Sequence, residues 1–192
     1  MQKNIVELME QEIINRSNKF EEETKGTKDE YNLFREHVQY VYKYATMIAK
    51  EKDVDLEIVK LSALLHDIAM TDSSLDRSKH NEYGVLIAEE LLLKENYPIE
   101  KIEKVKQCIL NHSSKRKEYR TTLEEQILVD ADGMSHFDCI DSLYSLARNV
   151  MGLKEEESLK FVKDKLTKDY NEISEDVKKY VKEKYFEIIN IK

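Results

Sequence analysis

The stretch ALLHDIAM, residues 63–70, places a histidine and an aspartate side by side at the end of an apolar run. The apolar positions before the pair recur at helical spacing, and Asp55 is a suitable N-cap for that helix. Burying ionisable groups without partners costs much free energy. The pair therefore predicts a compensating polar partner or cation at the end of a buried helix.

The composition predicts one all-α domain. A chain of 192 residues can form a single sizeable core, and only 4 Gly and 1 Pro are available for the many turns of a sandwich or barrel. The net charge of -8, from 31 Lys+Arg against 39 Asp+Glu, disfavours binding to nucleic acid, which requires a basic face. We expect a compact helical bundle spanning residues 1–192, of undetermined oligomeric state.

Targeting and membrane signals are absent from the pattern of residues. No stretch of about 18 apolar residues occurs, so we do not expect a membrane partner. We expect a cytoplasmic location. The two cysteines, Cys108 and Cys139, lie in helical patterns and form no C-x-x-C pair. We expect both to be buried free thiols.

Local signals divide the chain into helices separated by short polar breaks. Gly26 is a plausible terminator, Ser78 a candidate cap and Pro98 a first-turn residue, and Thr122–Glu125 reads as a capping box. The expected helices cover residues 2–24, 30–51, 55 to the His-Asp pair, 79–94, 99–113 and 122 to about 137. Two further amphipathic helices within 153–192 are expected to complete the bundle.

Four of the five histidines fall on the apolar faces of four different helices. Residues three, four and seven apart share a helix face, and this test places His37, His66, His80 and His112 inward. For His80 the row continues through Ile87 and Leu91. A lone inward histidine is usually a hydrogen-bonded core residue, but four of them indicate a shared site.

Two aspartates accompany these histidines. Asp67 and Asp132 lie at or near the same inward faces, where a bound cation would balance their charge. Imidazole and carboxylate together suit a divalent transition metal, Mn, Fe, Co, Ni or Zn, whereas an all-oxygen set would favour Mg or Ca. The sequence therefore predicts one or two such ions as cofactors.

The order His37, His66-Asp67, Asp132, with its "ALLHD" and "VDAD" contexts, resembles the signature of the HD-domain superfamily of metal-dependent phosphohydrolases over about residues 33–140. The resemblance implies an all-α bundle in which these four residues hold one divalent ion. His80 and His112 resemble the additional histidines of members that bind two metals. In that arrangement Asp67 bridges the ions, which makes it the expected catalytic residue.

The chain also departs from some members of that superfamily. The HD-GYP cyclic dinucleotide phosphodiesterases continue the pair as HDIGK, whereas this chain has Ala69-Met70 and no GYP tripeptide. These differences weigh against cyclic dinucleotide activity and remove a lysine that would contact phosphate. Lys115 and Arg116, shortly after His112, are the candidates to bind the substrate in its place.

Asp130, Asp132 and His136 lie close together in the sequence, and we expect a different role for each. Asp130 and Asp132 are two apart on a helix and cannot face the same ion. Asp132 matches the superfamily pattern, which leaves Asp130 as a possible hydrogen-bond partner of a ligand histidine. His136 shares the side of Asp132, and we expect a hydrogen-bonded histidine there, with metal ligation as the alternative.

The resemblance implies a phosphohydrolase that cleaves a phosphate ester or anhydride of a small molecule, most plausibly a nucleotide or dinucleotide, with a metal-activated water. A 5'-nucleotidase or phosphomonoesterase is the alternative among enzymes. A non-catalytic nucleotide sensor with the same metal site is the alternative of another class. A helical interaction protein with structural histidines is a third interpretation.

Overall fold

The computed structural model describes residues 4–190, and this span contains helices and no strands, which confirms the predicted all-α class. The α-helices are α1 (Ile5–Thr24), α2 (Gln39–Ala49), α3 (Leu56–Leu65), α4 (His80–Lys94), α5 (Ile99–Asn111), α6 (Leu123–Ser135), α7 (Ile140–Ser145), α8 (Glu155–Glu172), α9 (Glu175–Lys178) and α10 (Lys182–Ile189). Short 3₁₀ turns are η2 (Ile68–Thr71), η3 (Arg77–Lys79) and η4 (Ser114–Tyr119). Two π-helical turns are η1 (Phe34–Val38) and η5 (Leu146–Val150).

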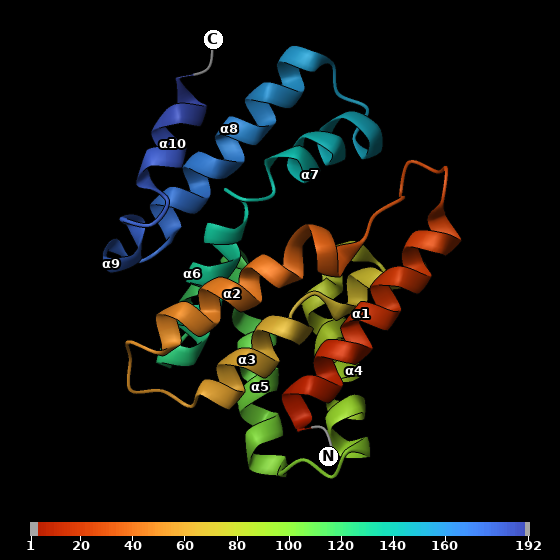
Figure 1. The fold of residues 1–192 in the computed structure, drawn as a ribbon, viewed down its shortest axis with the longest axis vertical. Helices are drawn as coiled ribbons and strands as arrows, with labels where there is room; N and C mark the ends of the chain where they lie inside the picture. The colour runs from red at the N-terminus through yellow and green to blue at the C-terminus, as the bar shows by residue number, and fades with distance from the viewer. Residues whose placement is uncertain (1–3, 191–192) are drawn as a thin grey trace.

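The helices pack around α2, α3 and α6. Helix α2 packs most extensively against α6 and also contacts α3, while α4 packs against α5 and α1 covers α3. Helix α8 packs against α6 and α10 (Figure 1) and forms, with α7 and α10, the end of the molecule farthest from α4 and α5. The His-Asp pair at the end of α3 is thereby enclosed by the surrounding helices.

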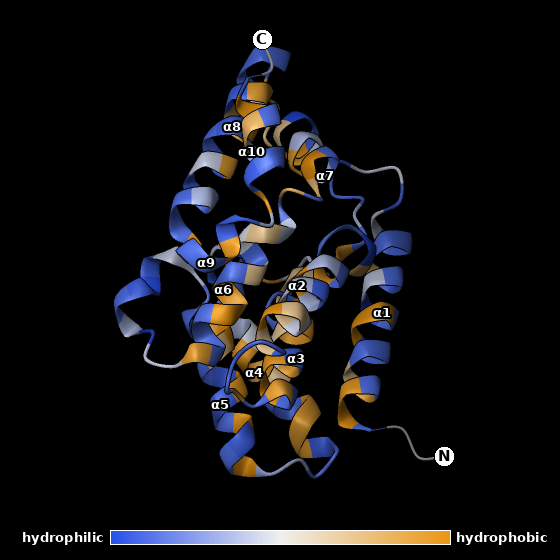
Figure 2. Cartoon of the chain, turned by 60° about the vertical axis from the view of Figure 1, so that its left-hand side comes forward, coloured by the Kyte–Doolittle hydropathy of each residue, from blue (hydrophilic) through white to orange (hydrophobic). Residues whose placement is uncertain are grey.

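The core is continuous from the first helix to the last. It includes Met9 of α1, Leu64 of α3, Leu128 of α6 and Ile188 of α10. Figure 2 shows hydrophobic residues concentrated on α3 and α4 and hydrophilic residues along the outer sides of α5 and α8. Full burial of an aliphatic side chain such as Leu64 contributes roughly 1.5–3 kcal/mol, so this core holds the site-bearing helices firmly in place.

Several predicted helix boundaries are confirmed. The Asp55 carboxylate accepts hydrogen bonds from the backbone N–H groups of Glu57 and Ile58 and caps α3. The predicted capping box, Thr122–Glu125, opens α6. Gly26, just after the end of α1, has a φ of 74°, the left-handed conformation that favours glycine. Local capping chemistry therefore positions the starts of two helices that carry site residues.

The predicted capping residue of α4 was wrong, whereas its predicted range, 79–94, agrees with the observed helix to within one residue. Ser78 does not cap α4: the Asp76 carboxylate accepts from the Ser78 N–H at 2.9 Å and caps the short turn η3, which precedes α4. The N-cap of α4 itself is Lys79, which makes no side-chain capping hydrogen bond. The most deeply buried face of α4 includes Gly84, and the predicted row through Ile87 and Leu91 is partly buried and packs against the core. A Cβ at Gly84 would lie 3.2 Å from the carbonyl oxygen of His66. The missing side chain thus lets α4 approach the end of α3 and sets its rotation.

The segments at either end of the core also differ from the prediction. The helix expected over residues 30–51 begins with the π-helical turn η1, and α7 with η5 was not predicted. The two helices expected within 153–192 are three, because the backbone is extended at Ile173, with ψ at 152°, and leaves helical geometry again at Val181. The first break lies where the backbone N–H of Ser174 donates to Asp130 of α6, and neither break coincides with a Gly or Pro.

Two further expectations concern membranes and thiols. Within residues 4–190, every helix is too short or too polar to traverse a bilayer. Cys108 and Cys139 are buried and unbridged, as predicted. The single-domain organisation stays a prediction, consistent with the continuous core.

Candidate metal centre

Three predicted ligands converge on one point between α2, α3 and α6. His37 Nε2 lies 3.1 Å from His66 Nε2 and 3.2 Å from Asp132 Oδ1, and His66 Nε2 lies 3.9 Å from the same oxygen. These three atoms lie within reach of a single ion. His37 and His66 are buried, which excludes most solvent from one side of this trio.

A second trio lies directly beside the first. The Nε2 atoms of His80 and His112 are 3.2 Å apart, and each is 3.5 Å from Asp67 Oδ1. The other oxygen of the same carboxylate, Oδ2, is 3.5 Å from His66 Nε2 and 3.7 Å from His37 Nε2. The Asp67 carboxylate therefore presents one oxygen to each trio.

The ends of helices position most of these side chains. Helix α3 ends at Leu65, and Asp67 leaves helical geometry at φ -111° and ψ 16°, so the adjacent His66 and Asp67 side chains both reach the centre. His112 follows the last residue of α5, and His37 lies in the π-helical turn η1. Such turns expose backbone and side chains at angles that a continuous helix does not offer.

Backbone carbonyls fix the tautomers of three histidines. The Nδ1 atoms of His66, His80 and His112 lie 2.9, 2.9 and 2.6 Å from the carbonyl oxygen three residues earlier. A carbonyl can only accept, so each Nδ1 carries a hydrogen. The Nε2 atoms consequently face the centre, where their lone pairs can bind a metal ion, as metal-ligating histidines require.

The Ser135 hydroxyl fixes the tautomer of His37. The Ser135 hydroxyl donates to the backbone carbonyl of Asp132 at 2.7 Å, so its oxygen accepts from His37 Nδ1 at 3.2 Å. This arrangement leaves His37 Nε2 to hold either a proton or a metal ion. Ser135 itself is buried and lies three residues after the predicted ligand Asp132.

The ionisation of these groups reflects burial and their mutual charges. Burial lowers the pKa of His66 to about 4. Burial acts in the same direction on His37, but the carboxylates of Asp132 and Asp67 outweigh it and raise the pKa of His37 to about 10. Burial raises the pKa of Asp67, yet the neighbouring His66 and His112 hold it well below its usual range. The centre thus combines ionised carboxylates with a site that retains positive charge, and metal binding there would release a proton.

The unsatisfied atoms of the centre fit a divalent cation. Asp67 Oδ1 is buried and accepts no hydrogen bond from the described residues. The Nε2 atoms of His80 and His112 lie beside it, 3.2 Å from each other. Buried polar atoms are normally paired, so the donor set of imidazoles and carboxylates suits one or two transition-metal ions.

Asp130 has a different environment from the one expected. Its carboxylate accepts hydrogen bonds from the Gln126 side chain and from the backbone N–H of Ser174, both at 2.9 Å, and not from a ligand histidine. It therefore joins α6 to the segment that leads into α9. Because Asp130 and Asp132 are two residues apart on the helix, their side chains point in different directions.

The basic residues expected to bind substrate lie away from the centre. Lys115 is exposed, and Arg116 donates from Nε to Asn111 Oδ1 at 2.9 Å and lies over the Tyr119 ring. Neither lines the cavities beside the histidines. The structure therefore does not bring these two side chains to the centre, and their role in substrate binding stays a prediction.

His136 is connected to a helix whose contribution the sequence did not reveal. Its Nδ1 lies 2.9 Å from Asp169 Oδ2 on α8, and Lys165 Nζ lies 2.7 Å from Asp169 Oδ1. His136 Nε2 is 3.9 Å from Asp132 Oδ1, and its ring stacks on that of His37. Only the spacing of four between Lys165 and Asp169 on a helix was a sequence signal, and it is common on exposed surfaces.

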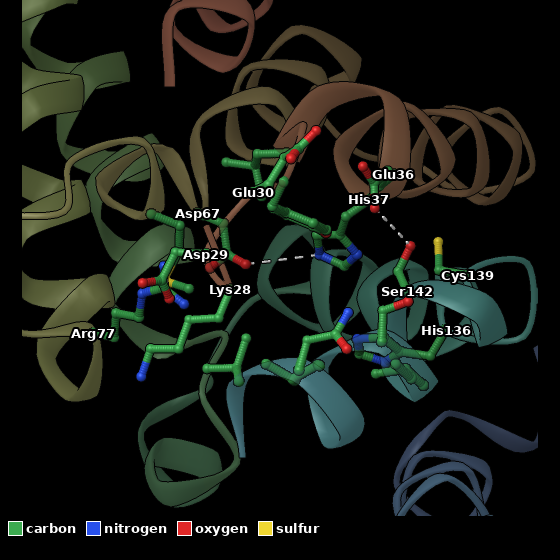
Figure 3. Close-up of a pocket in the computed structure, with 18 residues that line it drawn as sticks. Lys28, Asp29, Glu30, Glu36, His37, Asp67, Arg77, His136, Cys139 and Ser142 are labelled. Carbon is green, nitrogen blue, oxygen red and sulfur yellow. Dashed lines mark hydrogen bonds and ion pairs between the residues drawn. The ribbon is translucent and has the colours of Figure 1, made fainter. Parts of the chain in front are cut away.

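A cavity of about 280 Å³ opens beside the first trio. Figure 3 shows His37, Asp67 and His136 among the residues that line it, together with Lys28 and Arg77. Apolar residues of the unpredicted segment α7–η5 form another part of its wall. The centre is therefore accessible to a small organic molecule rather than sealed.

Comparisons with known proteins agree with this geometry. The profile of the family described as HD domain matches residues 34–135, more than half of the chain. A crystal structure of a predicted HD superfamily hydrolase from an uncultured Thermotogales bacterium is 25% identical and has a TM-score of 0.54, over 94% of this chain and 99% of the other. None of the curated proteins matches the chain.

The helical fold and the histidine-aspartate centre define a hydrolase class built to hold metal ions. The chain belongs to the HD domain family and is an HD superfamily hydrolase. The resemblance predicted from the His66-Asp67 pair is thereby confirmed. Residues 136–190, including His136 and α8, lie outside the matched region.

Proposed function

We propose that this hydrolase cleaves a P–O bond of a phosphate ester or anhydride in a nucleotide or dinucleotide. The observation that carries the proposal is the Asp67 carboxylate, whose two oxygens lie 3.5 to 3.7 Å from the histidines of two separate trios. A carboxylate shared in this way between two metal-ligand sets is typical of hydrolytic centres acting on phosphate.

The ligand assignment follows the two trios. His37, His66 and Asp132 would hold one divalent ion, and His80 with His112 would hold a second, with Asp67 shared between them. Ions of Mn, Fe, Co, Ni or Zn bound there would polarise a phosphoryl oxygen and lower the pKa of a bound water. The protein keeps the ligand lone pairs directed inward through the backbone carbonyls and Ser135.

The larger cavity supplies a place for the organic part of the substrate. Its wall includes Leu33, Met70 and Leu146, which suit the face of a base or sugar, and Asn149 can hydrogen-bond to a base edge. Lys28 and Arg77 also line this cavity and can approach a phosphoryl group, although Arg77 is paired with Asp29 at 3.7 Å. These features support a nucleotide over a purely inorganic phosphate.

Activity on defined compounds tests the proposal. Metal-free protein would be reconstituted with Mn, Fe(II), Co, Ni or Zn and assayed against nucleoside mono-, di- and triphosphates, dinucleoside polyphosphates and p-nitrophenyl phosphate. We expect metal-dependent release of phosphate or nucleotide by the wild type, its loss in Asp67→Asn and its retention in Asp53→Asn, which alters an exposed aspartate.

Two results would contradict the proposal. Binding of metal and nucleotide without turnover of any compound would favour a sensor. Failure to bind any of the metals would favour purely structural histidines.

A further inference from the structure

A second, smaller cavity lies against the second trio. It has a volume of about 160 Å³ and is lined by residues that include His80, His112, Asp132, Ser114 and Lys168. It shares no lining residue with the larger cavity, in which His37, Asp67 and His136 take part. The histidine-aspartate centre therefore forms part of the wall of two different cavities.

Lys168 gives this smaller cavity an available positive charge. Its Nζ donates to the Ser114 hydroxyl at 2.9 Å, and no carboxylate among the described residues lies within ion-pair distance of it. Lys165, one turn earlier, is by contrast held by both oxygens of Asp169. The carboxylates that line the same cavity already have cationic partners: Asp132 faces His37, Asp169 is held by Lys165, and Glu172 pairs with Arg120. The exposed Lys168 is therefore the lining cation without a carboxylate partner, and it favours an anionic ligand.

A buried arginine holds the cavity walls in place. The Arg120 guanidinium, whose side chain is 5% exposed, donates to the backbone carbonyls of His112 and Ser113 at 3.1 and 3.0 Å. The same group pairs with Glu172 of α8 at 3.4 Å. It therefore ties the loop that carries Ser114 to the helix that carries Lys168. Because its own charge is matched by Glu172, the unmatched charge in the cavity remains that of Lys168.

We propose that the smaller cavity binds a second phosphoryl group, so that the substrate is a phosphoanhydride with phosphoryl groups on both sides of the bond that breaks. Lys168 and Ser114 hold one phosphoryl group, and the larger cavity holds the organic end. This inference rests on the proposed function and narrows its substrate class. A monoester has no group that would reach Lys168.

The reaction balances as a simple hydrolysis. A water oxygen forms a bond to one phosphorus, and the bond from that phosphorus to the bridging oxygen breaks. The bridging oxygen leaves with the other phosphoryl group, and the protons of the water are shared between the two phosphate products and solvent. No oxidant or reductant is needed.

Binding of a stable anhydride analogue tests the inference without turnover. Mn-loaded, desalted full-length protein would be titrated calorimetrically with methylenediphosphonate, whose bridging carbon resists hydrolysis, and with methylphosphonate. We expect the diphosphonate to bind the wild type at least about tenfold more tightly, the effect of one charge-assisted hydrogen bond. Metal content measured before and after each titration excludes stripping of the ions.

Single substitutions identify the side chains that cause the difference in affinity between the two phosphonates. Lys168→Ala should lower the affinity for the diphosphonate by about tenfold and leave the affinity for methylphosphonate unchanged, since only the second phosphoryl group reaches Lys168. Ser114→Ala should act in the same direction. Lys160→Ala, an exposed lysine on the same helix that does not line the cavity, should change neither affinity. Turnover of ADP should exceed that of inorganic pyrophosphate, because the organic end contributes binding.

The possible failures are distinguishable. Equal affinities for the two phosphonates in the wild type, or an unchanged diphosphonate affinity in Lys168→Ala, would overturn the inference even if monoesters are hydrolysed and the proposed function stands. Tight, Lys168-dependent diphosphonate binding without turnover of any nucleotide would overturn the proposed function and keep the phosphoryl site. Faster turnover of pyrophosphate than of ADP would overturn the placement of the organic end.

Discussion

Replacing Asp67 by asparagine should remove both metal ions at once. Its Oδ2 lies 3.5 and 3.7 Å from the Nε2 atoms of His66 and His37, and its Oδ1 lies 3.5 Å from those of His80 and His112. An asparagine of the same size keeps one weaker oxygen donor and loses the negative charge. Both trios therefore lose a ligand through a single substitution.

The expected magnitude follows from binding linkage. A ligand that binds only the folded state stabilises it by about 2.7 kcal/mol at 100 times its Kd, so two ions contribute about 5.4 kcal/mol. For a protein of this size, 1 kcal/mol shifts Tm by about 2–4 °C, so metal should raise the wild-type Tm by about 11–22 °C. Asp67→Asn should abolish most of this shift, whereas His112→Ala should retain about half of it, because the ligands of the first ion remain.

Differential scanning calorimetry with and without Mn, on protein first treated with a chelator, measures these shifts. Metal content per chain after desalting gives the stoichiometry independently. Asp53→Asn is the control, since it removes an exposed carboxylate far from any histidine in the sequence. The control should show the full wild-type shift and the wild-type metal content.

Three results would refute the shared-carboxylate reasoning. Asp67→Asn with two ions per chain and an undiminished Tm shift would show that Asp67 is not a ligand of either ion. Loss of the whole shift in His112→Ala would show one site rather than two. A partial shift in Asp67→Asn equal to that of His112→Ala would assign Asp67 to the second ion alone.

Further outcomes are expected elsewhere in the molecule. Ser135→Ala should lower the affinity for the first ion by about 10 to 100-fold in competition titrations, because the hydrogen bond that fixes the His37 tautomer is lost. The affinity for the second ion should not change. Asp138→Asn should lower the free energy of unfolding at pH 7 by about 1–3 kcal/mol. The pKa of Asp138 is lowered on folding, because Lys184 outweighs burial, so urea titrations should show this difference fully above the unfolded pKa and shrinking as the pH falls through the folded one. Gly133→Ala should destabilise by about 1–3 kcal/mol in the same assay, since its Cβ would lie 2.8 Å from Ile173 Cγ2.

Local sequence signals were sufficient for the helices that carry the proposed ligands. Asp55 and the Thr122–Glu125 box marked the starts of α3 and α6, because capping is satisfied within a few residues of the chain. Helical periodicity likewise separated Asp130 from Asp132, which face different surroundings in the structure. Chemistry that depends on neighbours along one helix is readable from sequence.

Contacts between residues of different helices around the centre could not be predicted from the sequence in this way. The rotation of α4 depends on how closely Gly84 lets it approach the end of α3. The partner of His136 is 33 positions away at Asp169, and the break before α9 lies where Ser174 donates to Asp130 of α6. No periodicity links such residues, because their contact depends on which helix faces meet.

The sequence by itself determined the all-α class, the HD pair at the end of α3 and the set of inward histidines, since each follows from spacing within a helix. Only the tertiary structure decided that the Asp67 carboxylate divides between two trios and that two separate cavities adjoin them. It also placed Lys168, and neither Lys115 nor Arg116, in the lining of the smaller cavity. The physical reason is that Lys168 and Ser114 are 54 residues apart and become neighbours only through the packing of α8 against α6 and the clamp formed by Arg120.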